Sequence, residues 1–332
     1  MTDLTVGSLC TGIAGLEHGL NLAGLNTDIV FVSDIDKGAC AWLEANVSAP
    51  NLGDFTDLDE LPQVDILTAG FPCQPLSLAG LRKGHIDERW LFDDICRLVG
   101  RMGTRPVLFL ENVPGLLSAN NGHAMARVVH GLAGIGYGIT WGTMAAAAIG
   151  APHGRLRWWA VAADTDGLAA RRDGRAAFSS EEQGRRQPHE GDRPRHGGDA
   201  VVADTDMPRR QQHSRPEPTQ TQLDPVKHSS NSVRFGDFDE AITRWEHVLG
   251  RTAPDSTVDG RLNPGFVEWM MGYPEGWVTD TLTNPRHALH ALGNAVVPQC
   301  AAAAFTALAN RVDDQAADGR SQTPAARSLT RW

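Results

Sequence analysis

A cysteine flanked by prolines is the residue of this chain best suited to nucleophilic chemistry. Cys73 stands in the run Gly70-Phe71-Pro72-Cys73-Gln74-Pro75-Leu76-Ser77, at the end of the apolar residues 64–69. Proline fixes φ and removes a backbone donor, so the turn that presents the thiol is stiff. A lone cysteine is more often a small buried hydrophobe than a nucleophile. The interpretation of Cys73 as a nucleophile therefore depends on the residues that accompany it.

Glycines and acids follow two other apolar segments. Gly12 and Gly15 lie where a predicted strand turns into a helix, and Asp34 and Asp36 follow the next predicted strand. Such glycines let the backbone approach a ligand, and an acid after the second strand suits a ribose diol. Taken alone this pattern is weak, because glycines at a turn between strand and helix are usually structural.

A carboxyl group and two arginines complete the set of candidates. Glu111 ends a predicted strand, as Cys73 does, and ligands of open α/β sheets bind outside the carboxyl ends of strands. The thiol and the carboxyl are therefore expected to share a crevice, although Glu111 alone could be a helix N-cap or a solvated loop acid. Arg155 and Arg157 would point to one face of a strand, where they either grip phosphate and base or form a solvated edge.

The elements that must position these side chains alternate between strands and helices. Apolar runs predict strands at 5–10, 29–33, 64–69 and 106–111, and amphipathic stretches predict helices at 14–23, 37–46, 90–102 and 123–133. This alternation predicts an α/β fold with a parallel sheet covered by helices on both faces. Further helices are expected at 235–249 and, rich in alanine, at 294–310.

Residues 164–234 interrupt this pattern. They are rich in Arg, Gly, Pro, Asp, Gln and Ser, and their apolar content is too low for independent folding. They hold twelve Arg/Lys and twelve Asp/Glu, so the net charge of −10 comes from the rest of the chain. A nucleic-acid-binding face must then be a local patch with salt-dependent association. A six-residue motif at 161–166 recurs at 201–206, which favours a duplicated segment or linker.

The cysteines and the apolar content bound the class of protein. The five cysteines are scattered and form no CxxC pair, so we expect neither a disulfide framework nor a metal site. No run of eighteen apolar residues occurs and the N-terminus is acidic, so we expect no membrane span and no signal peptide. The cysteine pattern favours the reducing cytoplasm, and we expect a monomer.

An ordered set of short blocks accompanies the cysteine loop. The blocks are Ser8-Leu9-Cys10-Thr11-Gly12-Ile13-Ala14-Gly15-Leu16, Ser33-Asp34-Ile35-Asp36, Gly53-Asp54, Arg89-Trp90-Leu91-Phe92, Glu111-Asn112-Val113, His153-Gly154-Arg155-Leu156-Arg157, Arg261-Leu262-Asn263-Pro264, Met271-Gly272-Tyr273-Pro274 and Gly293-Asn294-Ala295-Val296-Val297-Pro298. In content and order this set resembles the DNA (cytosine-5) methyltransferase family. The resemblance covers nearly all of the chain except 164–234 and the C-terminal tail.

The resemblance implies a Rossmann-like S-adenosylmethionine-dependent methyltransferase fold with an inserted smaller target-recognition domain. The expected organisation is a catalytic and cofactor-binding domain at 1–163, a flexible low-complexity insertion at 164–234, the remainder of the target-recognition region at 235–284, a C-terminal helix that completes the catalytic domain at 285–312, and a disordered tail at 313–332. The implied partner is double-stranded DNA, methylated in restriction-modification or as a phage or orphan activity.

Roles for single residues also come from the resemblance. Cys73 would add to C6 of a flipped cytosine, Glu111 would act as the acid at the ring, and Arg155 and Arg157 would hold base and backbone, before a methyl group passes from S-adenosylmethionine to C5. Asp34 would bind the ribose hydroxyls and Asp54 would face the adenine amino group. The full expected cofactor-binding set is Gly12, Ala14, Gly15, Asp34, Asp54, Pro72, Leu91, Asn294 and Val296.

Three positions depart from the family pattern. Cys10 stands where phenylalanine is usual, Ala14 where glycine is usual and His153 where glutamine is common, which bears on cofactor affinity and on the geometry of the arginine loop. Three other functions remain open at this point: an RNA methyltransferase with the same core, an inactive DNA-binding relative and a dinucleotide-dependent oxidoreductase. The absence of a Cys-Phe-Thr tripeptide disfavours the RNA methyltransferase, and the presence of both Cys73 and Glu111 disfavours the inactive relative. The lack of a full GxGxxG motif disfavours the oxidoreductase.

Overall fold

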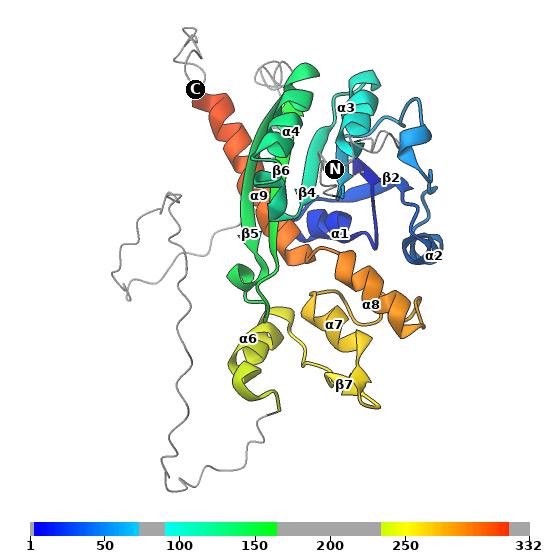
Figure 1. Ribbon diagram of the computed structural model, residues 1–332, viewed down its shortest axis with the longest axis vertical. Coiled ribbons are helices and arrows are strands. Elements are labelled where there is room, and N and C mark those ends of the chain that lie inside the picture. Colours follow the sequence, from blue (N-terminus) through cyan, green and yellow to red (C-terminus); the bar gives the residue numbers. More distant parts are fainter. Residues whose placement is uncertain (1–2, 73–89, 165–233, 319–332) are drawn as a thin grey trace, which may run out of the picture. The chain divides into compact units, whose positions relative to one another are not determined.

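Six strands form a mixed sheet in the part of the chain that the computed structural model describes, residues 3–72, 90–164 and 234–318 (Figure 1). The strand order is β2 (Thr27–Ser33), β1 (Leu4–Leu9), β3 (Ile66–Ala69), β4 (Val107–Asn112), β6 (Leu156–Asp164) and β5 (Tyr137–Ala145). The first four strands in this order pair in parallel, whereas β6 is antiparallel to both β4 and β5. The expectation of a parallel sheet is thus right for β1 to β4 and wrong for the edge formed by β5 and β6.

β5 and β6 are antiparallel because the connection between them is short. Only residues 146–155 join β5 to β6, and a parallel pair would need a crossover of a dozen residues or more. Because β6 is antiparallel to β4, the first residues of β6 lie beside the last residues of β4, with Asn112 opposite Trp158 in register.

Helices cover both faces of the sheet, as predicted. Alternate side chains along β4 enter two separate cores: Phe109 packs against α9 (Pro298–Asp318), while Leu108 and Leu110 belong to the core of the opposite face. The core with Phe109 also contains side chains of α1 (Gly15–Leu22) and α2 (Lys37–Asn46), and the other contains those of α3 (Leu91–Arg101) and α4 (His123–Gly134). This arrangement confirms the α/β fold class.

A second group of elements packs onto the core that contains α1 and α9. It consists of α6 (Asp239–Leu249), α7 (Pro264–Met270) and α8 (Pro285–Asn294). Between α6 and α7 in the chain, β7 (Thr257–Val258) and β8 (Arg261–Leu262) form an exposed hairpin. The helix expected at 235–249 begins only at Asp239, after a 3-10 turn at Gly236–Phe238. Trp245, Trp269 and Tyr273 are fully buried and anchor this group.

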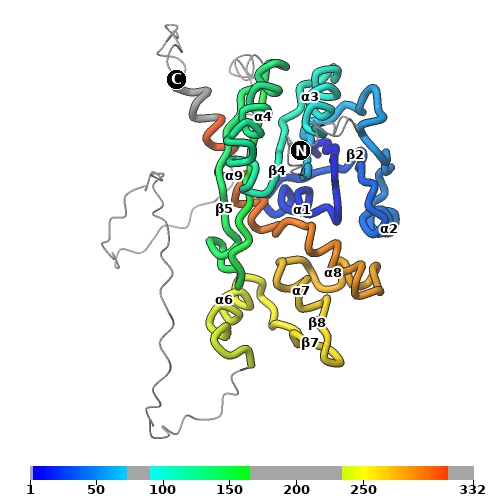
Figure 2. Tube along the Cα trace, viewed as in Figure 1, coloured from blue at the N-terminus to red at the C-terminus, as the bar shows by residue number. Residues whose placement is uncertain are grey.

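The expected single C-terminal helix is in fact two helices. α8 ends at Asn294, α9 begins at Pro298, and Figure 2 follows the trace between them. Pro298 lacks a backbone donor and disfavours helical conformation in the residue before it, so the helix cannot run through. Within the described residues, the stretch Pro285–Val312, which comprises α8 and the first part of α9, has the length and composition of a membrane span, but half of its apolar window is buried in the fold, as in a core helix.

Candidate active site

A cavity of about 410 Å³ opens where β1, β3 and β4 end. Nine of the residues that the sequence predicts for the site are among its lining residues: Gly12, Gly15, Asp34, Pro72, Glu111, Arg155, Arg157, Asn294 and Val296. They come from strand ends, from the start of β6 and from the connection between α8 and α9. The volume lies within the range of small-molecule sites, which is about 300–1,000 Å³.

The turn after β1 forms one wall. Gly12 has φ +60 and open space where a side chain would begin, so this turn exposes its backbone to the cavity. Its N–H donates to Asp34 Oδ2 at 2.7 Å, and Asp36 N–H donates to Asp34 Oδ1 at 2.9 Å. The carboxylate of Asp34 is therefore fixed at the end of β2, where its remaining lone pairs can accept hydroxyl groups of a ligand.

Ala14, Asp54 and Leu91 are not among the residues that line the cavity. Ala14 is the N-cap of α1 in a left-handed conformation, and Leu91 begins α3 and packs partly buried against the core. Asp54 is exposed but near the cavity. Burial, then Asp34, then Asp54 raise the pKa of the Cys10 thiol to about 12, and Cys10 is a lining residue.

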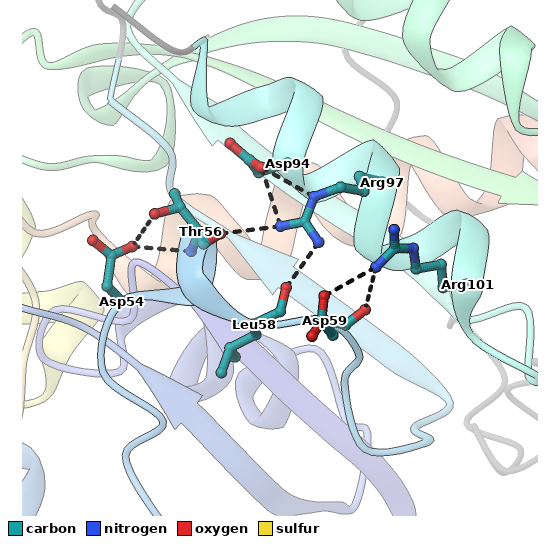
Figure 3. A network of polar contacts seen from close by, with 7 residues as sticks. All are labelled: Asp54, Thr56, Leu58, Asp59, Asp94, Arg97 and Arg101. Carbon is teal, nitrogen blue, oxygen red and sulfur yellow. Dashed lines mark hydrogen bonds and ion pairs between the residues drawn. The ribbon is translucent and has the colours of Figure 1, made fainter.

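Hydrogen bonds from Arg97 on α3 stabilise the turn that carries Asp54, as Figure 3 shows. Thr56 donates to Asp54 Oδ1 from its backbone N–H at 2.9 Å and from its hydroxyl at 2.8 Å. Arg97 donates to the carbonyl oxygens of Leu58 at 2.8 Å and Thr56 at 3.2 Å, and to Asp94 Oδ1 at 3.1 Å. No local sequence pattern marks Arg97 for this role, because its carbonyl partners lie about forty residues away.

Glu111 and Arg157 form the polar centre of the opposite wall. Glu111 is 9% exposed, and its Oε1 lies 3.0 Å from Arg157 Nε. Burial raises the pKa of Glu111 to about 7, although the charges of Arg157 and Arg155 act in the other direction. A substantial fraction of this carboxyl group therefore carries a proton near neutral pH, so the group can donate a hydrogen bond.

The segment before the predicted nucleophile reaches the same cavity. Phe71 and Pro72 line it, and the buried Asn112 donates from Nδ2 to the carbonyl oxygen of Phe71 at 2.8 Å. Asn112 thus connects the end of β4 to the residues that follow β3, a role that was not predicted from the sequence. Cys73 itself lies outside the described residues.

Arg155 enters the cavity wall with different partners from those of Arg157. Its guanidinium donates to the carbonyl oxygens of Gly293 at 2.9 Å and Ala295 at 2.5 Å. His153, two residues earlier, contacts the carbonyl oxygen of Met270 through Nε2 at 3.0 Å, and burial lowers the pKa of its imidazole. Both side chains therefore connect the start of β6 to segments far along the chain.

Fold and site together define the class of protein: a Rossmann-like α/β protein with a cavity at its strand ends. A family model described as C-5 cytosine-specific DNA methylase matches residues 4–310, and the chain belongs to this family. Among solved structures, the S. pombe Dnmt2 methyltransferase shares the fold, with a TM-score of 0.56 and 17% identity over 93% of this chain and 99% of that chain.

Curated relatives match part of the chain. The Type II methyltransferase M.MspI of Moraxella sp is 36% identical over 165 residues, which are 48% of this chain and 39% of the relative. The Type II methyltransferase M.BanI of Aneurinibacillus aneurinilyticus is 36% identical over 155 residues, 45% of this chain and 36% of the relative. The matched region thus spans less than half the length of these two relatives.

Proposed function

We propose that this chain is a DNA (cytosine-5-)-methyltransferase, which transfers a methyl group from S-adenosylmethionine to C5 of a flipped cytosine in double-stranded DNA. The observation that carries the proposal is the position of Glu111, a buried carboxyl with a raised pKa that shares one cavity with the glycine turn, with Asp34 and with Pro72, the residue before Cys73. Membership of the methylase family and the Type II methyltransferases among the relatives point to the same activity.

The chemistry begins with the activation of cytosine. C6 is a poor electrophile, and a protonated Glu111 that donates to N3 withdraws electrons from the ring. The Cys73 thiolate then forms a bond to C6, since thiolate rather than thiol is the nucleophile. Arg157, which pairs with Glu111 at 3.0 Å, orients that carboxyl and offers its remaining donors to the base.

The later steps restore the ring. The electron pair gained at C5 would form the bond to the donor's methyl group while the methyl–sulfur bond breaks. The C5 proton would then leave to a base, and elimination of Cys73 would reform the C5–C6 double bond. Inside a stacked duplex the ring faces are inaccessible, so the target cytosine must rotate out of the helix. The substrate side of the cavity is then the wall of Glu111 and Arg157.

The residues of the other wall fit the methyl donor. Gly12 leaves its backbone open at φ +60, and Asp34 is fixed where ribose hydroxyls can donate to it. Gly15, Asn294 and Val296 line the same space, and Asp54, whose charge acts on the lining residue Cys10, would face the adenine amino group. S-adenosylmethionine bound there would supply the methyl group of a sulfonium, whose sulfur leaves as a neutral thioether, so its departure needs no metal.

The test is methyl transfer from tritiated S-adenosylmethionine to unmethylated duplex DNA, with transfer RNA as the competing substrate. We expect label in DNA, and we expect Cys73→Ser to retain DNA and cofactor binding but to lose turnover. Label in RNA alone, label in neither substrate, or near-normal turnover of the Cys73→Ser variant would each contradict the proposal. Bisulfite sequencing of a methylation-free host that expresses the chain reports the methylated site.

A further inference from the structure

The connection between α8 and α9 forms a wall of the cavity and is held by its backbone. Gly293, Asn294, Ala295 and Val296 all line the cavity. After α8 ends, its last carbonyl oxygens lack helical partners, and such groups need donors from elsewhere. Side chains far away in the sequence supply these donors to three residues of the segment.

Arg155 supplies two of these contacts. One terminal nitrogen of its guanidinium donates to the carbonyl oxygens of Gly293, at 2.9 Å, and Ala295, at 2.5 Å. A positive charge at the C-terminal end of α8 also complements the helix dipole. These contacts cross about 140 residues of sequence and join the start of β6 to the end of α8.

Tyr273 supplies the third contact. Its side chain is fully buried, and its hydroxyl group donates to the carbonyl oxygen of Val296 at 2.9 Å. The hydroxyl can reach this position because Gly15 has no side chain: a Cβ there would lie 2.3 Å from the Tyr273 oxygen and 2.8 Å from Val296 Cγ2. Gly15, Tyr273 and Val296 therefore join the wall of the glycine turn to the wall of the α8–α9 connection.

Arg155 and Arg157 consequently differ in what they contact. Arg157 pairs with Glu111, on the side of the cavity assigned to the base. Arg155 is occupied by carbonyl oxygens of the segment that carries Asn294 and Val296, two expected cofactor-binding residues. Because the guanidinium of Arg155 bonds to this segment, Arg155 influences binding of the methyl donor rather than of the base.

We propose that Arg155 and Tyr273 are positioning residues for the methyl donor. They hold the 293–296 segment by three carbonyl oxygens in the shape that completes its pocket. The proposal rests on the proposed function for the identity of the ligand. It concerns binding on the donor side only and assigns contact with the flipped base to Arg157.

The test measures binding of S-adenosylhomocysteine by calorimetry in the absence of DNA. Tyr273→Phe keeps the buried ring and removes only the hydroxyl, and Arg155→Lys keeps the charge but loses the planar fork. Each variant should weaken binding about three- to thirtyfold, the equivalent of one hydrogen bond to a buried carbonyl. In the matched control Arg157→Lys, S-adenosylhomocysteine binding should stay within about twofold of the unmodified chain, because Arg157 pairs with Glu111 and the contacts to Gly293 and Ala295 belong to Arg155.

Steady-state kinetics gives a second readout that a general structural defect would not reproduce. Arg155→Lys and Tyr273→Phe should raise KM for the methyl donor and leave KM for DNA unchanged. Arg157→Lys should raise KM for DNA and leave KM for the methyl donor unchanged. Unchanged S-adenosylhomocysteine binding in both Arg155→Lys and Tyr273→Phe, or a rise confined to KM for DNA in Arg155→Lys, would overturn the inference. Failure of the unmodified chain to bind the probe would instead overturn the proposed function.

Discussion

At the scale of single residues, Glu111 is the group whose protonation the site controls. Burial favours the neutral carboxyl, while Arg157 and Arg155 favour the charged one, and burial dominates because the pKa is raised to about 7. The site thus holds a carboxyl that can donate to a base near neutral pH and that is still close enough to an arginine to be oriented by it.

The pH dependence of stability should reveal this balance. Because the proton binds Glu111 more tightly in the folded chain than in the unfolded chain, this group stabilises the fold most below its ordinary pKa of 4.5, and the contribution is lost as pH rises through about 7. The free energy of unfolding of Glu111→Gln, relative to the unmodified chain, should therefore increase by about 2 kcal/mol between pH 5 and pH 8.

Urea unfolding at the two pH values measures this change. Glu240→Gln, an exposed carboxyl on α6, controls for the amide itself. If the free energies of unfolding of Glu111→Gln and the unmodified chain change equally between pH 5 and pH 8, the pKa of Glu111 is not raised in the folded chain. In turnover assays, the falling limb of the pH profile near pH 7 should disappear in Glu111→Gln, at much reduced rate.

Gly12 offers a second test at this scale. Its φ of +60 disfavours any residue with a Cβ, so Gly12→Ala should lose about 1 kcal/mol of stability. The new methyl group would also enter the cavity, which should weaken S-adenosylhomocysteine binding. Gly24→Ala is the matched control: Gly24 also has positive φ, +88, and open space, but it is not a cavity-lining residue. Equal loss of binding in both variants would argue against a ligand at the Gly12 turn.

At the scale of elements, the antiparallel placement of β6 decides which side chains meet. Asn112 pairs with Trp158 and Glu111 with Trp159, so the residues at the start of β6 lie beside the end of β4. A parallel strand in the same position would carry Arg155 and Arg157 to the opposite edge of the sheet. The Glu111–Arg157 pair is therefore a property of the strand direction.

α3 makes a comparable contribution to the Asp54 turn (Figure 3). Arg97→Met should remove the donors to Thr56, Leu58 and Asp94 and lower the free energy of unfolding by about 1–2 kcal/mol. The same variant should bind S-adenosylhomocysteine more weakly, because Asp54 loses its support. Arg101→Met is the control: its pair with Asp59 is more exposed and should contribute less than about 0.5 kcal/mol. Equal effects of the two substitutions would contradict this role of Arg97.

At the scale of the whole molecule, charge and composition separate the catalytic core from the predicted target-recognition region. The net charge of −10 comes from residues outside 164–234, while the Arg pairs Arg171-Arg172, Arg185-Arg186 and Arg209-Arg210 lie inside it. DNA binding should therefore depend strongly on salt and on these arginines. Sequence choice needs contacts to base edges, which phosphate contacts alone do not provide.

Deletion of 167–200 tests whether this region selects the site. We expect the variant to retain S-adenosylhomocysteine binding, since the cavity-lining residues lie outside the deleted segment. The set of methylated cytosines should change or broaden in bisulfite sequencing of a methylation-free host. An unchanged set would show that the segment makes no contribution to target choice.

The sequence by itself determined the features that depend on neighbouring residues. Gly12 and Gly15 at a turn from strand to helix, Asp34 after β2 and Glu111 at the end of β4 follow from local patterns of apolar, glycine and acidic residues, and all four line the cavity. The α/β class and the helices on both faces follow from the same patterns. The bounds of α1, α3 and α4 differ from the expected ranges by a residue or two.

Only the tertiary structure decided which distant groups meet. The pairing of β6 with β4, the contacts of Arg97 with the Asp54 turn and the contacts of Arg155 and Tyr273 with the 293–296 segment all join residues far apart in the chain. A local pattern records burial and turn geometry, but it carries no information on which carbonyl oxygen a buried donor will reach. Packing settles that choice, because most buried polar groups find a hydrogen-bond partner in the folded chain.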